Sequence, residues 1–598
     1  MRASIQEHFL KRFYYIILVS FLVLSCKSEE QDEGETYQTH FESSNGEETA
    51  TYLQTIDFYI RLAREFPEIN MQTMGKTDSG YPLHIITYNP DGDFNFQKIG
   101  DKKTVILINN GIHPGESDGI DATMLLYRDL ATGQIEAPEN TVLVTIPIYN
   151  IGGAMNRNST TRVNQNGPKS YGFRGNTLNY DLNRDFIKAD SKNAKTFYEI
   201  FHMVKPDIFI DNHVSNGADY QYTLTHLFTQ HNKLGGALGS YLHEEMMPKL
   251  VEGLKKDNWE ITPYVNVFNA VPENGFSQFM DSPRYSTGYT TLWNTFGMMV
   301  ETHMLKPYEQ RVKGTYKLME KMLTIAESDY EKIKLLRAEA VHRHKEWKYY
   351  PTQWQVDPTR VSQLDFLGYE ADTLTSEITG FDRLKYDRER PFSKKVRYSN
   401  YFKAVDSVEI PSAYVLRKGW TRVTDLLDLN DIDYQTLQRD TSLTVEAYKI
   451  KNYDTSLVPY EGHYPHKNTE VNVTLKRVQF QQGDIIIPTD QLGFRYILET
   501  LEPSTVDSFF NWNFFDPILQ QKEGFSPYVF EDLALEILKE NAALKDSFLL
   551  KKENDPTFAS NWYSQLSYIY ENSEYYEKAH NQYPVYRLMK ESQEGNKN

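Results

Sequence analysis

Residues 104–118 read Thr-Val-Ile-Leu-Ile-Asn-Asn-Gly-Ile-His-Pro-Gly-Glu-Ser-Asp. The apolar run over 104–108 predicts a buried strand, and the glycine-bearing turn after it presents His113 and Glu116 at the strand's end. An imidazole and a carboxylate can face one cation, and a catalytic zinc site needs three such protein ligands and an open position for water. The pair alone is unspecific, because His-x-x-Glu arises by chance roughly once in a chain of this length. The rest of the chain therefore decides its meaning.

Strand-like and helix-like segments alternate on both sides of this stretch. Strand patterns cover 83–88, 105–108, 142–148, 207–211 and 298–301, and helical patterns cover 52–63, 120–130, 191–204 and 234–255. A longer helix over about 312–347 follows. Such alternation predicts a layered α/β domain with a largely parallel or mixed sheet. Of the two we take a mixed, twisted sheet flanked by helices. We place this domain at residues 51–348.

The texture of the sequence changes beyond residue 350. Short strand-like runs at 396–398, 443–450, 471–478 and 484–487 are separated by prolines and charged turns. Residues 420–437, and the chain from about 490 onward, have a helical pattern. We therefore predict an α+β accessory region over 349–598, to which the sequence assigns no role.

The first 26 residues have the pattern of a secretory signal. Lys11 and Arg12 precede an apolar run over 13–24, which is shorter than the about 20 residues that a membrane-spanning helix needs. The run ends in Val23-Leu-Ser-Cys26, which resembles a bacterial lipobox. That resemblance implies a signal peptide over 1–25, cleaved before Cys26, and a diacylglycerol on the Cys26 thiol that anchors the protein in a membrane. A short uncleaved anchor is the alternative.

An acidic, polar segment follows the cysteine. Residues 26–50 hold too little apolar surface to fold alone, so we expect a flexible tether. An acidic run directly behind a lipidated cysteine resembles the surface-export signals of some Bacteroidetes lipoproteins. We therefore expect the cell envelope as the location, on the periplasmic face of the outer membrane or on the cell surface.

Composition and motifs exclude several classes of function. A formal net charge of −18 provides no basic field for phosphates, so we expect no nucleic-acid partner. No Walker A, GxGxxG or GxSxG pattern stands between a strand and a helix, which argues against a nucleotide cofactor and a serine hydrolase. Cys26 is the only cysteine, so the rest of the chain has neither a disulfide nor a thiol nucleophile.

A third metal ligand follows another apolar strand. The segment Pro206-Asp-Ile-Phe-Ile-Asp-Asn-His213 places an imidazole where the predicted strand over 207–211 ends. Open α/β sheets bind ligands outside the carboxyl ends of their strands. His113, Glu116 and His213 can therefore meet at one crevice, and two histidines with one glutamate are typical of a catalytic metal site.

Three further segments complete a pattern. They are Met74-Gly-Lys-Thr-Asp-Ser-Gly-Tyr-Pro-Leu, Phe173-Arg-Gly-Asn-Thr-Leu-Asn-Tyr-Asp-Leu-Asn-Arg-Asp-Phe186 and Phe296-Gly-Met-Met-Val-Glu-Thr-His303. With His113 and His213 they stand in the order found in the M14 family of zinc carboxypeptidases, which this chain resembles over about 51–311. Four matches in order are far less probable by chance than the single His-x-x-Glu pair.

The resemblance implies a metal and a mechanism. One Zn²⁺ per chain would be held by His113, Glu116 and His213, and it would acidify a bound water and polarise the scissile carbonyl. Glu301 would be the general base that takes the proton from that water and returns it to the leaving amine. Arg174 would stabilise the oxyanion that develops during attack.

The resemblance also implies how the substrate is held. Asn183 and Arg184 would bind the terminal carboxylate of a peptide, since a guanidinium matches a planar carboxylate. Asp181 would accept the second ring N–H of His113 and fix its tautomer. The family's mobile tyrosine corresponds to Tyr285 or Tyr289, of which we favour Tyr285.

The chain departs from the family pattern in places. The family's Asn-Pro-Asp-Gly turn is here Tyr149-Asn-Ile-Gly-Gly-Ala, and Val214 stands where a serine usually follows the third ligand. Three additional arginines offer to share or replace the carboxylate clamp: Arg157, Arg162 and Arg284. The side-chain preference at the cleavage site is therefore left open.

Three functions are compatible with this sequence. The first is a zinc metallocarboxypeptidase that hydrolyses C-terminal residues from peptides outside the cytoplasm. The second is a zinc amidase that acts on cell-wall peptides or other non-protein amides. The third is a non-catalytic lipoprotein that binds peptides or glycans in the cleft.

Overall fold

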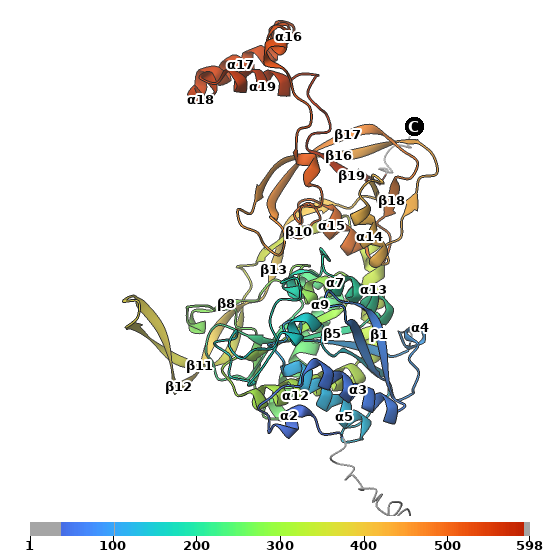
Figure 1. Cartoon of the computed structure of the whole chain (residues 1–598), viewed down its shortest axis with the longest axis vertical. Helices are drawn as coiled ribbons and strands as arrows, with labels where there is room; N and C mark the ends of the chain where they lie inside the picture. Colours follow the sequence, from blue (N-terminus) through green and yellow to red (C-terminus); the bar gives the residue numbers. More distant parts are fainter. Residues whose placement is uncertain (1–36, 101, 591–598) are drawn as a thin grey trace, which may run out of the picture.

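A computed structural model of the chain describes residues 37–100 and 102–590 (Figure 1). The predicted signal peptide and Cys26 lie outside the described residues. Within the described ranges, no helix combines the length and the apolar character that crossing a membrane requires.

In the described part of the chain, an eight-stranded mixed sheet is the central layer of the first half, with the order β1-β2-β4-β3-β5-β9-β6-β7. Its strands are β1 (Ile69–Lys76), β2 (Pro82–Tyr88), β3 (Thr104–Asn110), β4 (Thr141–Ile146), β5 (Ile208–Ser215), β6 (Leu224–Phe228), β7 (Ile261–Pro263) and β9 (Phe296–His303). Neighbours among β4, β3, β5 and β9 are parallel, whereas β2 and β6 join this group antiparallel. The predicted mixed sheet is confirmed.

Helices cover both faces of this sheet. In Figure 1, α3, α5 and α12 lie on one side of it and α7 and α9 on the other. The helices of this half are α3 (Tyr52–Glu65), α4 (Phe96–Gly100), α5 (Asp118–Ala131), α6 (Ile151–Met155), α7 (Lys192–Val204), α8 (His231–Leu234), α9 (Gly236–Tyr241), α10 (Met247–Lys256), α11 (Ser286–Thr291), α12 (Tyr308–Ser328) and α13 (Tyr330–Arg343). Because both faces are covered, β3, β4 and β5 are buried along their whole lengths.

Two expected helices are interrupted. The helix expected over 234–255 consists of α8, α9, a π-helical turn (Leu242–Met246) and α10, and the chain turns at Gly235 and Gly236, whose φ angles are 75° and 54°. The helix expected over 312–347 breaks at Asp329, between α12 and α13. There the Asp329 carboxylate accepts a hydrogen bond from the Tyr241 hydroxyl at 2.6 Å, which ties the break to α9.

The expected flexible tether differs from the structure over residues 37–50, which pack on the sheet domain. The short helix α2 (His40–Ser43) is capped by Thr39 and buries Phe41, whose ring meets Tyr308 edge-on at 5.8 Å. The Ala50 N–H donates to Asp121 Oδ1 at 3.2 Å. A capping box and one aromatic anchor hold this segment despite its acidic composition.

The second half of the chain is built from hairpins, a second sheet and helices, as the α+β expectation requires. Strands β10 (Tyr349–Val356) and β13 (Phe402–Glu409) pair, and β11 (Ser362–Thr375) and β12 (Asp382–Ser399) form a long hairpin joined by β8 (Phe276–Ser277). In the described residues, a six-stranded sheet has the order β15-β18-β14-β19-β16-β17. Its strands are β14 (Ala413–Leu416), β15 (Gln435–Thr436), β16 (Thr441–Thr455), β17 (His466–Phe480), β18 (Ile485–Pro488) and β19 (Gln582–Leu588).

Helices α14 (Thr421–Leu429) and α15 (Phe494–Leu501) pack near this second sheet, while α16 (Pro527–Glu540), α17 (Ala542–Asn554), α18 (Pro556–Ala559) and α19 (Trp562–Glu571) project away from the body (Figure 1). The helical pattern expected over 420–437 ends at Leu429, and strand β19 interrupts the helical C-terminal part. The two halves share one hydrophobic core, in which the rings of Trp293 and Tyr496 stack at 6.0 Å. The division at residue 348 remains a prediction.

Candidate metal centre and active site

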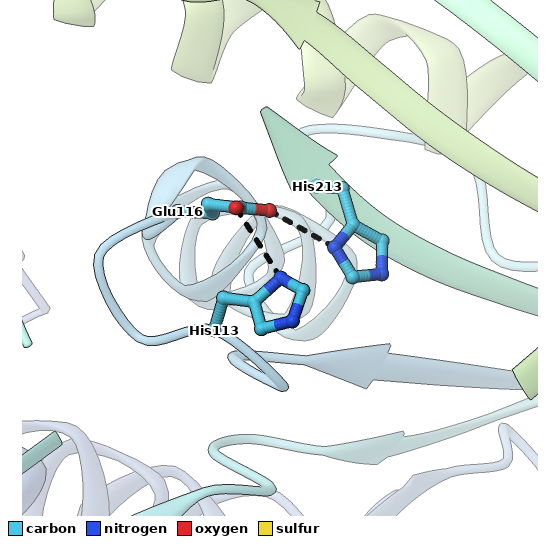
Figure 2. A group of neighbouring side chains, drawn as sticks. All are labelled: His113, Glu116 and His213. Atoms are coloured by element: carbon cyan, nitrogen blue, oxygen red, sulfur yellow. Dashed lines mark hydrogen bonds and ion pairs between the residues drawn. The ribbon is translucent and has the colours of Figure 1, made fainter. Parts of the chain in front are cut away.

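Three side chains, two from the loop after β3 and one from the neighbouring strand β5, converge at one edge of the large sheet. His113 and Glu116 lie in the loop between β3 and α5, and His213 lies on β5, so the third ligand is inside its strand rather than after it. The ligand atoms of the three residues lie within 4.8 Å of one another, and all three side chains are buried (Figure 2). Glu116 stands between the imidazoles, with Oε1 3.2 Å from His113 Nδ1 and Oε2 2.9 Å from His213 Nδ1.

Carboxylates hold both imidazoles from behind. His113 Nε2 donates to Asp181 Oδ1 at 2.9 Å, which is the contact expected from the sequence. His213 Nε2 donates to Asp211 Oδ2, also at 2.9 Å. Each histidine therefore turns Nδ1 toward the centre of the site. Asp211 was not identified from the sequence, although its place two residues before His213 puts both side chains on one face of the strand.

The charged surroundings change the ionisation of the site. Burial by itself would lower the pKa of His213, but the Asp211 and Glu116 carboxylates hold that pKa well above its usual range. Burial would raise the pKa of Glu116, but His113 and Arg162 keep it well below its usual range. A carboxylate and two imidazoles are thus assembled in an environment that favours an added positive charge.

The donor set fits a zinc ion. His113 Nδ1 is buried and has no hydrogen-bond partner among the described residues, although it faces Glu116. A buried polar atom without a partner is costly unless a ligand completes it. Two imidazole nitrogens and one carboxylate oxygen are a typical catalytic zinc set. His113, Glu116 and His213 are therefore the residues that would hold the metal.

The turn that carries the ligands needs a glycine. A Cβ on Gly115 would lie 2.5 Å from Arg162 Cδ, so only glycine lets the arginine pass over the loop. Arg162 Nη1 then donates to Glu116 Oε1 at 2.9 Å, and Gln165 Nε2 donates to the Gly115 carbonyl at 2.8 Å. The loop around residue 162 thus braces the metal-binding turn.

The candidate site opens into a cavity of about 640 Å³. Its lining includes every catalytic, metal-binding and substrate-binding residue expected from the sequence: His113, Glu116, Arg174, Asn183, Arg184, His213, Tyr285 and Glu301. Asp181 lies behind this lining, next to His113. The cavity lining also includes Tyr264, Asn266 and Phe268, which were not identified from the sequence. They lie in the irregular segment after β7, which contains no recognisable motif.

Glu301 lies on β9, opposite His213 in the parallel pairing of β5 with β9. Burial, together with the nearby Glu116 and Asp211 carboxylates, raises the pKa of Glu301 to about 8, although His213 and Arg174 act in the opposite direction. A carboxylate that accepts a proton near neutral pH therefore stands beside the candidate metal ligands.

Arg174 is fixed by Asp181. Its Nε and Nη2 donate to Asp181 Oδ2 at 3.0 and 2.7 Å, and its Nη1 lies 3.5 Å from Glu116 Oε1. Burial would raise the pKa of Asp181, but His113 and Arg174 keep it far below its usual range, so this carboxylate stays ionised. The guanidinium side chain is 44% exposed, which leaves it accessible from the cavity.

Asn183, Arg184 and Tyr285 stand together. The Arg184 guanidinium covers the Tyr285 ring at 4.6 Å. The Asn183 side chain is buried, and its Oδ1 accepts the Ser286 N–H at 3.1 Å. Tyr289 is fully buried and donates its hydroxyl to Asn430 at 2.6 Å, so Tyr285 is the tyrosine of the two that faces the cavity.

The three additional arginines have separate places. Arg162 lines the cavity, as described above. Arg157 donates to the Ser170 carbonyl at 2.7 Å, and Arg284 binds the Asp507 carboxylate at 2.6 Å; neither belongs to the cavity lining. Of these three, Arg162 is the one placed to contact a substrate.

The comparisons with known proteins agree with this geometry. Residues 55–206 match the family model described as zinc carboxypeptidase, peptidase M14. This segment belongs to the zinc carboxypeptidase family. The matched range of this hydrolase domain contains His113, Glu116, Arg174, Asn183 and Arg184 and ends before β5 and β9. No curated protein matches the sequence significantly.

Solved structures similar to the chain are also carboxypeptidases by name. A metallo-carboxypeptidase from Burkholderia cenocepacia is 14% identical over 46% of this chain and 68% of its own length, with a TM-score of 0.34. Carboxypeptidase A from Helicoverpa armigera is 14% identical over 47% of this chain and 74% of its own, with a TM-score of 0.36. A Pseudomonas aeruginosa metallo-carboxypeptidase in complex with (2-guanidinoethylmercapto)succinic acid is 14% identical over 46% and 69%, with a TM-score of 0.33.

The metal assignment predicts the effect of removing one ligand. His213→Ala leaves one imidazole and one carboxylate, so zinc should fall from about one ion per chain to nearly none after dialysis. Elemental analysis of the purified protein measures this. His84→Ala, on β2 away from the site, is the matched control and should keep its zinc. Unchanged metal content in His213→Ala would remove this residue from the site.

Proposed function

We propose that this chain is a zinc-dependent metallocarboxypeptidase that removes C-terminal residues from peptides outside the cytoplasm. The main observation in support is that one cavity is lined both by the candidate metal ligands and by Glu301, Arg174 and Arg184. The match of residues 55–206 to the zinc carboxypeptidase family supports this choice of reaction.

The proposed chemistry divides between the metal and the protein. His113, Glu116 and His213 would hold a Zn²⁺, which would supply an acidified water and a Lewis acid for the scissile carbonyl. Glu301 takes the proton of the attacking water and returns it to the leaving amine. The raised pKa of Glu301 suits this role, since the same carboxyl has to accept and release a proton near neutral pH.

Two arginines bind the negative charges on the substrate. Arg174, held by Asp181 next to the metal ligands, stabilises negative charge that develops on the carbonyl oxygen during attack. Arg184 binds the terminal carboxylate of the substrate, and Tyr285 supports its guanidinium from one face. Asn183 lines the same cavity, and because its Oδ1 accepts the Ser286 N–H, its Nδ2 is the group it would offer to the substrate carboxylate.

If Glu301 is the general base, its substitution should lower turnover without changing zinc binding. Glu301→Gln keeps the shape of the side chain but cannot take a proton. It should retain about one zinc per chain and lose on the order of 10³-fold or more in kcat. Peptide hydrolysis and elemental analysis of the same preparation measure both quantities.

The surface variant Glu309→Gln on α12 serves as the control and should match the wild type in both assays. Near wild-type turnover by Glu301→Gln would contradict the mechanism.

The internal contact of Arg184 fits one alternative, a zinc amidase whose substrate lacks a terminal carboxylate. Arg184 Nη1 already donates to the Asn183 carbonyl at 2.9 Å, so the guanidinium proposed to bind a terminal carboxylate is partly engaged within the protein. An amidase acting on cell-wall peptides would not need that recognition at all.

A pair of substrates separates the two reactions. A carboxypeptidase should cleave a peptide with a free C-terminus at least about 100-fold faster than its C-terminal amide, because the amide leaves the Arg184 charge unpaired. Mass spectrometry of products from matched free-acid and amidated peptide libraries, with and without a chelator, measures the ratio. Equal turnover of the two would favour the amidase, and zinc without any hydrolysis would favour a binding protein.

The proposed location rests on the sequence alone. The lipobox-like ending at Cys26 supports a lipid anchor in the outer membrane. If the anchor exists, Cys26→Ser should move the protein from the membrane fraction to the soluble fraction, while leaving peptidase activity unchanged. Fractionation and immunoblotting of cells expressing each form measure this, and equal membrane retention of both would contradict the anchor.

A further inference from the structure

A loop of the accessory region reaches the candidate active site. Between β16 and β17, Tyr460 and His463 pair across a two-residue turn, with N–O distances of 2.8 and 3.1 Å. Glu461 and Gly462 occupy the turn with φ angles of 50° and 81°. Both lie in the left-handed region, which suits Gly462 and is unfavourable for a glutamate. A strained residue at a turn tip suggests that its side chain has a specific task.

Three consecutive residues of this turn contact the segment that carries the Asp-x-Asn-Arg motif. Glu461 Oε2 accepts the backbone N–H of Asp181 at 2.8 Å. Gly462 lies so close to Tyr180 that a Cβ would come within 2.9 Å of its ring. His463 Nε2 donates to Asp190 at 2.7 Å. The turn therefore contacts both ends of the segment 180–190.

Asp181 connects these contacts of the turn to the candidate metal site. Its Oδ1 accepts from His113 Nε2 and from the Asn183 N–H, both at 2.9 Å. Its Oδ2 accepts two hydrogen bonds from Arg174. The position of the Asp181 main chain thus sets the orientation of a metal ligand and of the proposed oxyanion-stabilising cation.

From these contacts we propose that Glu461 is a positioning residue for the active site, and that the accessory region completes that site by holding Asp181 in place. The part concerning catalysis rests on the proposed function. The part concerning the metal does not, because Asp181 holds His113 whether or not a peptide is cleaved.

Other contacts already dock the two halves, so docking alone does not require Glu461. Arg284 binds Asp507 through its side chain and its backbone N–H, and its guanidinium lies 5.0 Å from the Trp512 ring. Glu461 instead places a second carboxylate near Asp181; burial and this neighbour raise the pKa of Glu461, while the hydrogen bond from the Asp181 N–H opposes the shift. Glu461 thus combines a strained backbone with a carboxylate that lies near another carboxylate. Both features oppose stability, so they fit a residue that positions Asp181 better than one that stabilises the fold.

Zinc affinity tests the proposal without any substrate. Glu461→Ala removes the acceptor for the Asp181 N–H, and the zinc dissociation constant, measured by competition with a chelator, should rise about 10-fold. Glu461→Gln retains an acceptor oxygen and should stay within about 3-fold of the wild type. Glu470→Ala, at an exposed pair with Lys451 on β17, is the control and should not change the constant.

A double-mutant cycle identifies the route. If Glu461 acts through Asp181, then Glu461→Ala should have little further effect on zinc affinity in an Asp181→Ala background. Thermal unfolding of each variant confirms that it is folded. If Glu461→Ala does not fold, Glu461→Asp, whose shorter side chain retracts the acceptor, takes its place with the same expected direction.

Any of three results would overturn the proposal. The folded variant at position 461 could bind zinc as tightly as the wild type, or Glu461→Ala could weaken zinc binding just as much in the Asp181→Ala background. Glu461→Gln could also lose as much zinc affinity as Glu461→Ala. In the peptidase assay, kcat/KM of Glu461→Ala should fall in parallel with zinc occupancy, and saturating zinc should restore part of it. If the peptide assays find no hydrolysis at all, the proposed function fails while the zinc measurements still decide the positioning role.

Discussion

The parallel pairing of β5 with β3 on one side and with β9 on the other is the constraint on which the rest of the site depends. It places the loop after β3, His213 and Glu301 at one edge of the sheet, although these parts are about a hundred residues apart in sequence. The three strands are buried under helices on both faces, so a shift in register would move apolar side chains into contact with charged ones. The geometry of the candidate metal ligands is therefore set by the core of the domain rather than by these side chains themselves.

Within that frame, carboxylates do most of the positioning. Glu116 joins the two imidazoles, while Asp181 and Asp211 hold them from behind. Burying several acids together is costly, and the positive charges of Arg162 and Arg174 beside them offset that cost. A divalent cation at the centre would offset it further. The same crowding raises the pKa of Glu301, so the arrangement that suits a metal also produces a carboxyl able to carry a proton.

Much of the catalytic half follows from sequence patterns, because its strands are short apolar runs and its helices are amphipathic. The accessory region was harder to predict. Strand β12 is mostly exposed and rich in charged residues, so it lacks the alternation that marks a half-buried strand. Strand β19 lies far along the chain from its partners β14 and β16, and long-range pairing leaves no local signal. Residues 37–50 looked too polar to fold, yet one buried aromatic ring and a capped turn hold them.

The sequence by itself named the candidate metal ligands, base and arginines, because the resemblance that carries them depends only on residue type and on order along the chain. It also determined that a strand delivers each ligand to the same edge of a sheet. Only the tertiary structure decided which side chains meet from distant segments. It put Tyr285, the tyrosine favoured from the sequence, on the cavity wall, placed Arg162 over Gly115 against Glu116, and brought Glu461 to the Asp181 backbone. Such contacts depend on how separate elements pack, and no spacing within one segment encodes them.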